Sequence, residues 1–170
     1  AIVGAVTHEV YWDREAMWEA LLYHGAQGEW LFSHNLEYDL PIVAGESLLD
    51  GKLTYRRAGL LWAAYPQGRR RARFLDSLNL FPRWSAAQLG ALLGHPKHDL
   101  EPELVARLAE APAHRSLGRD ERARVERYCA RDADIVFRAV ELLQELLLEL
   151  GGELRPTIGG CAMDLYRRTY

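Results

Sequence analysis

The chain has 170 residues, of which 49% are hydrophobic and 26% are charged, so it is long enough for one domain with a substantial core. Its net charge of −3 excludes a protein that binds nucleic acid through its overall charge. Cys129 and Cys161 exclude a disulfide framework, and no stretch is apolar enough to span a bilayer. We therefore expect a cytoplasmic protein in a reducing setting, with no membrane partner.

Strands and helices are predicted to alternate in the first half of the chain. A short hairpin over 2–12 precedes a helix that Asp13 caps, and an apolar strand covers 29–33. The next helix takes its first turns around Pro41. A second hairpin follows, with strands over 60–65 and 71–80.

The second half is predicted to be helical. The helices cover 86–93 after the cap Ser85, Pro102 to about Glu110, 120–150 before Gly151 and Gly152, and a last segment from near Thr157, while 111–119 reads as a loop. Strands interleaved with helices predict a single α/β domain over 1–170.

A basic run over 68–73 lies at the turn of the second predicted hairpin. It has two interpretations, a solvated turn or a contact with phosphate groups near a cleft. The sequence favours neither.

Two carboxylates, Asp39 and Asp132, are candidates for catalytic residues. Asp39 follows the apolar strand 29–33, and Asp132 lies in the long predicted helix, one turn after Tyr128 and in line with Val136. Asp132 should therefore point toward the protein and need a cation, whereas Asp134 lies on another face and is expected to be solvated. One interpretation of Asp132 is a structural residue bonded to an arginine.

The other interpretation joins the two carboxylates at one site. Side chains at the ends of strands converge at the edge of a sheet, so Asp39 and Asp132 could meet there. Two nearby carboxylates repel each other unless a divalent ion lies between them. Mg²⁺ or Mn²⁺ in a two-metal arrangement is suited to phosphodiester cleavage, and Tyr128 could then orient the attacking water.

Three motifs resemble those of the tyrosine-type DEDD 3′–5′ exonuclease domains of family-B DNA polymerases, of the protein-primed, viral and organellar kind. His34 and the run Asn35-Leu36-Glu37-Tyr38-Asp39 resemble the second exonuclease motif, and Tyr128-Cys129-Ala130-Arg131-Asp132 resembles the third. Between them, Asp76-Ser77-Leu78-Asn79-Leu80-Phe81-Pro82 resembles the Ser-Leu motif. Pro156-Thr157-Ile158 and Arg167-Arg168 are similar to the segment that leads toward a polymerase module.

The resemblance implies an RNase H-like fold, a mixed sheet flanked by helices, and hydrolysis at the 3′ end of single-stranded DNA. Matched position by position, it implies that Asp39 and Asp132 bind the metals and that Tyr128 positions water. It also implies that the terminal nucleotides are held by His34, Asn35, Tyr38, Ser77 and Leu78. Lys97 matches a basic residue that the family carries after the Ser-Leu motif.

The family's first motif, Asp-x-Glu on a strand, has no match here. Asp13-Arg14-Glu15 opens a predicted helix, and Thr7-His8-Glu9 has Thr in place of Asp. Either a strand carrying these acids precedes Ala1 in the natural protein, or the acids are lost and the domain only binds nucleic acid or acts as a scaffold. The expected partners are a DNA 3′ end and a polymerase module or another subunit, and an exonuclease that trims RNA is a third possibility.

Overall fold

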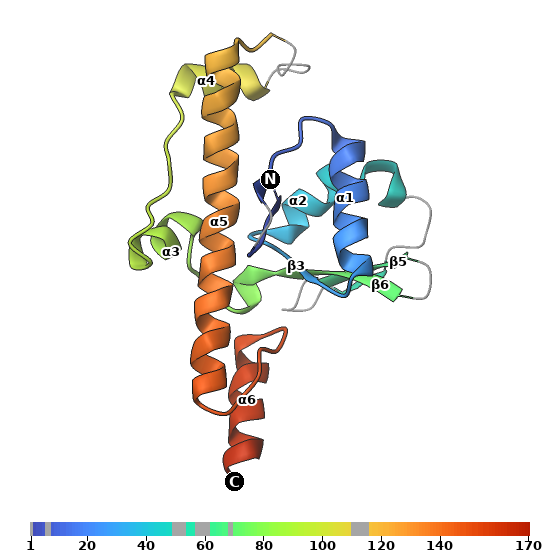
Figure 1. The fold of residues 1–170 in the computed structure, drawn as a ribbon, viewed down its shortest axis with the longest axis vertical. Coiled ribbons are helices and arrows are strands. Elements are labelled where there is room, and N and C mark those ends of the chain that lie inside the picture. Colours follow the sequence, from blue (N-terminus) through green and yellow to red (C-terminus); the bar gives the residue numbers. More distant parts are fainter. Residues whose placement is uncertain (1, 6–7, 49–53, 57–61, 68–69, 110–115) are drawn as a thin grey trace.

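The fold is α/β, as the sequence predicts (Figure 1). The computed structural model describes residues 2–5, 8–48, 54–56, 62–67, 70–109 and 116–170. The strands are β1 (Ile2–Val3), β2 (His8–Glu9), β3 (Trp30–Ser33), β4 (Thr54–Arg56), β5 (Trp62–Gln67) and β6 (Arg70–Asp76). The helices are α1 (Arg14–Ala26), α2 (Leu36–Ala44), α3 (Ala86–Leu92), α4 (Pro102–Ala109), α5 (Arg119–Glu149) and α6 (Ile158–Thr169), with 3₁₀ helices at Gly45–Leu48 and Ser77–Asn79.

The main sheet has the strand order β3–β6–β5–β4, and β1 and β2 form a separate hairpin. β3 runs parallel to β6, with Ser33 opposite Asp76, while β5 is antiparallel to both of its neighbours. Within the described residues, β3 is therefore an edge strand. Because the parallel strands end together, the segments after Ser33 and Asp76 emerge side by side, and they carry the second and the Ser-Leu motif.

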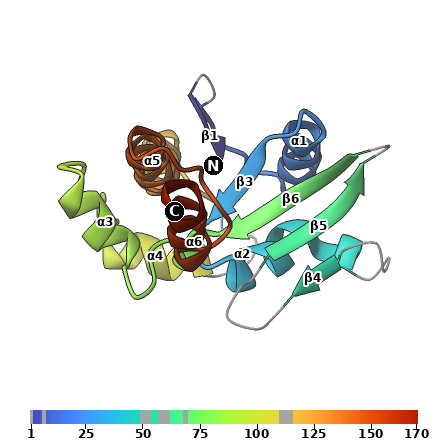
Figure 2. The same ribbon diagram turned by 90° about the horizontal axis from the view of Figure 1, so that it is seen from below.

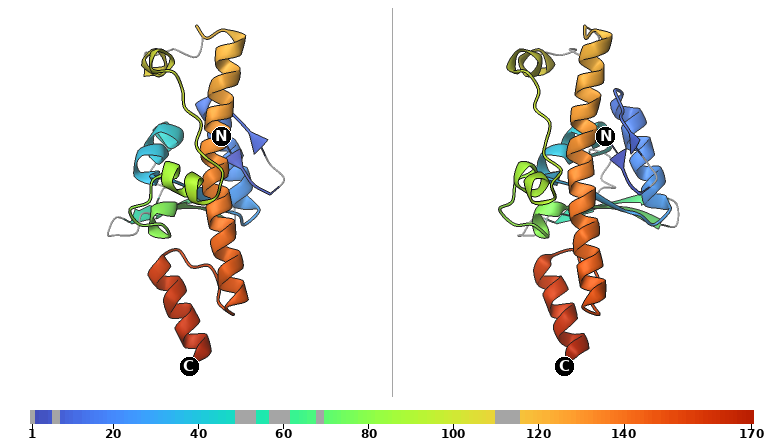
Figure 3. Two further views of the ribbon diagram at one scale, coloured as in Figure 1. Left: turned by 90° about the vertical axis from the view of Figure 1, so that its left-hand side faces the viewer. Right: turned by 60° about the vertical axis from the view of Figure 1, so that its left-hand side comes forward.

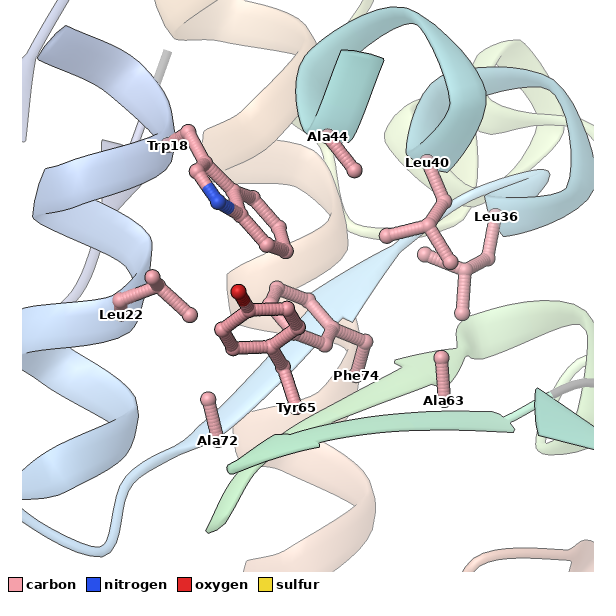
Figure 4. Close-up of a cluster of buried hydrophobic side chains, with 9 residues drawn as sticks. All are labelled: Trp18, Leu22, Leu36, Leu40, Ala44, Ala63, Tyr65, Ala72 and Phe74. Carbon is pink, nitrogen blue, oxygen red and sulfur yellow. The ribbon is translucent and has the colours of Figure 1, made fainter. Parts of the chain in front are cut away.

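One face of the sheet is covered by α1 and α2 (Figure 4). Trp18 of α1 stacks on Phe74 of β6 with the ring centroids 5.4 Å apart, and it meets Tyr65 of β5 edge-on at 5.3 Å. Burial of such large aromatic side chains is a main source of folding free energy. This core fixes α2, and with it Asp39, above the sheet.

The long helix α5 contacts β3 and extends well beyond the sheet, where α6 packs against it (Figure 3). Phe32 of β3 packs against a cluster that contains Val140 and Leu147 of α5 and Cys161 of α6. α3 packs on α5 through Leu89 and Ile135. The end of β3 is thereby held against the helix that carries Tyr128 and Asp132.

Several local predictions are confirmed. Asp13, Ser85 and Thr157 each cap a helix with a side-chain oxygen, and Cys129 and Cys161 are free thiols. β4 was not predicted. The turn of the second hairpin at 68–69 and most of the predicted loop, 110–115, lie outside the described residues. None of the helices described here combines the length and apolarity needed to cross a membrane.

Candidate functional site

Asp76 connects the ends of the two parallel strands. The residue is 6% exposed, and its carboxylate accepts backbone hydrogen bonds from Asn35 (3.1 Å), Leu36 (2.9 Å) and Leu78 (2.9 Å). A buried carboxylate is tolerated when N–H donors satisfy it in this way. Asp76 therefore holds the first residues of α2 against the Ser77–Asn79 turn and fixes both motifs relative to each other.

Three predicted nucleotide-binding residues lie around this junction and reach solvent. Asn35 adopts a left-handed backbone conformation (φ 87°), which asparagine tolerates better than most residues, and its exposed side chain makes no capping bond. Tyr38 is 66% exposed, and His34 is half-buried with its Nδ1 2.9 Å from Ser77 Oγ. Ser77 is fully buried, so its hydroxyl does not reach solvent and contacts the His34 ring instead.

Asp39 lies in the first turn of α2 and is half-buried. Its Oδ2 accepts a hydrogen bond from the hydroxyl of Ser33, the last residue of β3. The free N–H groups at the start of a helix favour acidic side chains in its first turn, where Glu37 and Asp39 both lie. The strand end and the helix start together orient Asp39.

Asp132, Tyr128 and Lys97 form a second group, on α5 and on the segment between α3 and α4. Lys97 Nζ lies 2.7 Å from Asp132 Oδ2 and 4.7 Å from the centroid of the Tyr128 ring. The cation expected for Asp132 is thus a lysine rather than an arginine. The other oxygen, Asp132 Oδ1, is buried and has no hydrogen-bond partner among the described residues.

Lys97 stays ionised at this position. Partial burial lowers the pKa of its ammonium group, but Asp132 and Tyr128 outweigh burial and raise the pKa above the usual lysine value. The ammonium group in turn neutralises one side of the Asp132 carboxylate.

Contacts among His95, Asp134, Arg138 and Arg131 hold the Lys97 segment on α5. His95 Nε2 lies 2.5 Å from Asp134 Oδ2, Arg138 donates to the same oxygen at 2.9 Å, and Arg131 Nη1 lies 2.7 Å from His95 Nδ1. The prediction that Asp134 is solvated is therefore wrong, because its side chain is only 13% exposed. Hydrogen bonds from His95, which is distant in sequence, and from Arg138, one turn along α5, replace water around it.

The predicted site residues thus fall into two groups, one around Asp39 and His34 and one around Asp132 and Lys97. In the part of the chain that the structure describes, no hydrogen bond or ion pair joins the two groups, although β3 and α5 are in contact. Nor do three or more metal-binding side chains gather in that part. The unpartnered Asp132 Oδ1 fits a metal ligand, but the described residues supply an incomplete ligand set.

Asp76 and His95 have structural roles at the site that the sequence did not assign. The signal for Asp76 was present, because a carboxylate at the end of a buried strand needs several donors. The partners of His95 lie more than 35 residues away, and no local pattern predicts them. In comparisons with known proteins, no family model, no curated protein and no solved structure matches this chain.

Proposed function

We propose that the chain is a metal-dependent 3′–5′ exonuclease domain of the tyrosine DEDD type, with an RNase H-like fold, which acts on single-stranded DNA. The observation that carries the proposal is the environment of Asp132. One carboxylate oxygen is paired with Lys97 and the other is buried without a described partner, next to Tyr128. A buried acceptor left without a partner is costly, which points to a missing cation.

Each residue has a defined role in this proposal. Asp132 and Asp39 would hold Mg²⁺ or Mn²⁺, which when bound supplies an activated water and offsets charge on the phosphate. Lys97 orients Asp132 through the contact between its ammonium group and Oδ2. The Tyr128 hydroxyl would orient the attacking water, while His34, braced by Ser77, would contact the terminal nucleotide.

Asn35 and Tyr38 would complete the nucleotide-binding side of the site. Their exposed amide and ring suit hydrogen bonding to and stacking on a terminal base. Leu78 lies on the Ser77–Asn79 turn, and its backbone N–H shares Asp76 Oδ1 with the N–H of Asn35. A strand that pairs with the edge of β3 opposite β6, where the described residues supply no strand partner, could contribute the two further acids, since its end would lie beside Ser33. A polymerase module or another subunit is the proposed protein partner.

The direct experiment is release of mononucleotides from a 3′-labelled oligodeoxynucleotide with Mg²⁺ or Mn²⁺, using the longest natural form of the protein. Asp132→Asn should abolish release, because the amide cannot replace a charged metal ligand. Asp120→Asn, which changes an exposed residue in the first turn of the same helix, should leave it unchanged. Equal digestion by the Asp132→Asn variant and the parent would contradict the proposal.

A second candidate is a non-catalytic nucleic-acid-binding or scaffold domain. It is favoured by the finding that, within the described residues, no three metal-binding side chains lie together. Such a domain would bind oligonucleotides but release no mononucleotides with either metal. Competition between DNA and RNA oligomers of one sequence separates a DNA enzyme from one that trims RNA, because the 2′-hydroxyl is the distinguishing group.

A further inference from the structure

Two arginines project from the side of the main sheet that faces away from α1 and α2. Ala72 and Phe74 of β6 point into the core (Figure 4), and alternate residues of a strand point to opposite faces. Arg71 and Arg73 therefore point to the other face, and both are exposed. In Figure 2, the described helices leave β5 and most of β6 uncovered on this face, and α6 lies near the end of β6.

An aromatic side chain lies beside these arginines. Trp30 of β3 is the parallel partner of Arg73 in the register of the sheet. Its neighbour Leu31 packs toward the core on the α1 side, so Trp30 lies on the same face as Arg73, where it is half-buried. Cationic groups next to an aromatic ring on a sheet are a common surface for single-stranded nucleic acids.

Neither arginine has an acidic partner in the described part of the chain. Several other arginines do, such as Arg107 with Glu121 and Arg155 with Asp164. Two unneutralised guanidinium groups on a surface with an aromatic ring favour a polyanion over a neutral ligand. The patch formed by Trp30, Arg71 and Arg73 is therefore complementary in charge to a nucleic-acid backbone.

The strand β6 connects this patch to the proposed 3′-end site. At about 3.3 Å per residue, Arg73 lies roughly 13 Å and Arg71 roughly 20 Å before Ser77, which braces His34. On the same face, Leu75 of β6 is buried and its partner Phe32 packs against the cluster of α5 and α6, so a single strand whose terminal nucleotide lies at His34 would pass over these covered residues before it reaches the arginines. Nucleotides upstream of the terminus would then meet the patch.

We propose that Trp30, Arg71 and Arg73 form a second binding surface that holds the single strand several nucleotides upstream of its 3′ end. The inference rests on the proposed function, because that function places the terminus at His34. The nucleic-acid-binding site then has two parts. The terminal part, around His34, binds the last nucleotides, and the patch of Trp30, Arg71 and Arg73 binds only longer strands.

The test measures binding of 5′-labelled oligothymidylates of four and twelve nucleotides by fluorescence anisotropy, with EDTA present to prevent hydrolysis. The double variant Arg71→Gln/Arg73→Gln should weaken 12-mer binding about tenfold and leave 4-mer binding unchanged. Since each phosphate contact to a single strand contributes about 0.7 to the salt slope, the slope for the 12-mer should fall by about 1.4. Trp30→Ala should weaken 12-mer binding with little change in slope.

The control is Arg119→Gln/Arg127→Gln, which removes equal charge from two exposed positions in the N-terminal half of α5 and should change neither affinity. Equal losses for both oligomers, an equal effect of the control, or competition by polyglutamate as strong as by DNA would overturn the inference. The inference is also overturned if the 4-mer binds and the Arg71→Gln/Arg73→Gln variant binds the 12-mer as well as the parent does. That result would not contradict the proposed function. Binding of the 12-mer through the patch without any binding of the 4-mer contradicts the proposed function instead.

Discussion

At the scale of single residues, the arrangement depends on one buried carboxylate, Asp76, and two half-buried ones, Asp132 and Asp134, and on their donors. Asp76 satisfies three backbone N–H groups from two segments that are about 40 residues apart in sequence. Asp132 and Asp134 each pair with a cation of their own, Lys97 and Arg138. Removing such a carboxylate leaves its donors unpaired, which costs more than the hydrogen bonds themselves contribute.

Asp76→Ala is expected to lower the free energy of unfolding by about 2–4 kcal/mol, because three N–H donors lose their charged acceptor. Asp76→Asn keeps one acceptor oxygen and should lose less. Urea denaturation measures both. If the alanine variant unfolds at the same urea concentration as the parent, Asp76 does not hold the two motifs together.

Asp134 predicts a pH dependence of stability. Desolvation raises the pKa of its carboxyl group, but hydrogen bonds from Arg138 and His95 outweigh it and leave the pKa below the usual value of 3.8. A pKa that is lower in the folded state stabilises the fold at pH values above the pKa of the unfolded state. This contribution disappears as the pH falls through the pKa of the folded state. Asp134→Asn should therefore lower the free energy of unfolding by about 1 kcal/mol near pH 6, and by less below pH 3.8.

Urea midpoints measured from about pH 6 down to about pH 3 test this expectation. Asp99→Asn, a substitution at an exposed aspartate, serves as the control and should run parallel to the parent. A constant difference between Asp134→Asn and the parent over the whole range would contradict the assigned ion pairs.

At the scale of elements, local chemistry predicted most helices and the second hairpin. Asp13, Ser85 and Thr157 mark helix starts because their side chains satisfy free N–H groups, a signal that the sequence carries in full. β4 was missed because three residues, Thr54–Arg56, carry little periodicity, and their pairing with β5 is a tertiary effect. The cap residues and motifs were thus predictable from the sequence. The contacts of His95 with Asp134 and Arg131 were not, because they depend on how α3 packs on α5.

Close packing between α3 and the Lys97 segment predicts the effect of a single methyl group. A Cβ at Gly90 would lie 2.7 Å from the backbone oxygen of His95 and 2.9 Å from Ile135 Cδ1, so Gly90→Ala should destabilise by about 1–3 kcal/mol. Gly159→Ala adds a methyl group in open space near the start of α6 and should stabilise by up to about 1 kcal/mol. Thermal unfolding measures both variants: the midpoint should fall for Gly90→Ala and rise for Gly159→Ala. A change in the same direction for both would contradict the prediction.

At the scale of the whole molecule, the parallel pair β3–β6 and the helix α5 bring motifs from three distant parts of the chain onto neighbouring elements (Figure 1). The sequence predicted the α/β class because strands and helices alternate in its first half. It could not predict the strand order, since the pairing of β3 with β6 joins segments that are distant in sequence. The RNase H-like order and the metal site stay predictions.

The central claim is that Asp39 and Asp132 share one bound divalent ion. The measurement that tests it most directly is a Mn²⁺ titration followed by electron paramagnetic resonance of the free ion, on the parent, both single variants to Asn and the double variant. A shared ion predicts that Asp39→Asn and Asp132→Asn each remove the same binding and that the double variant loses no more. Binding that survives either single substitution, or losses that add in the double variant, would contradict the account.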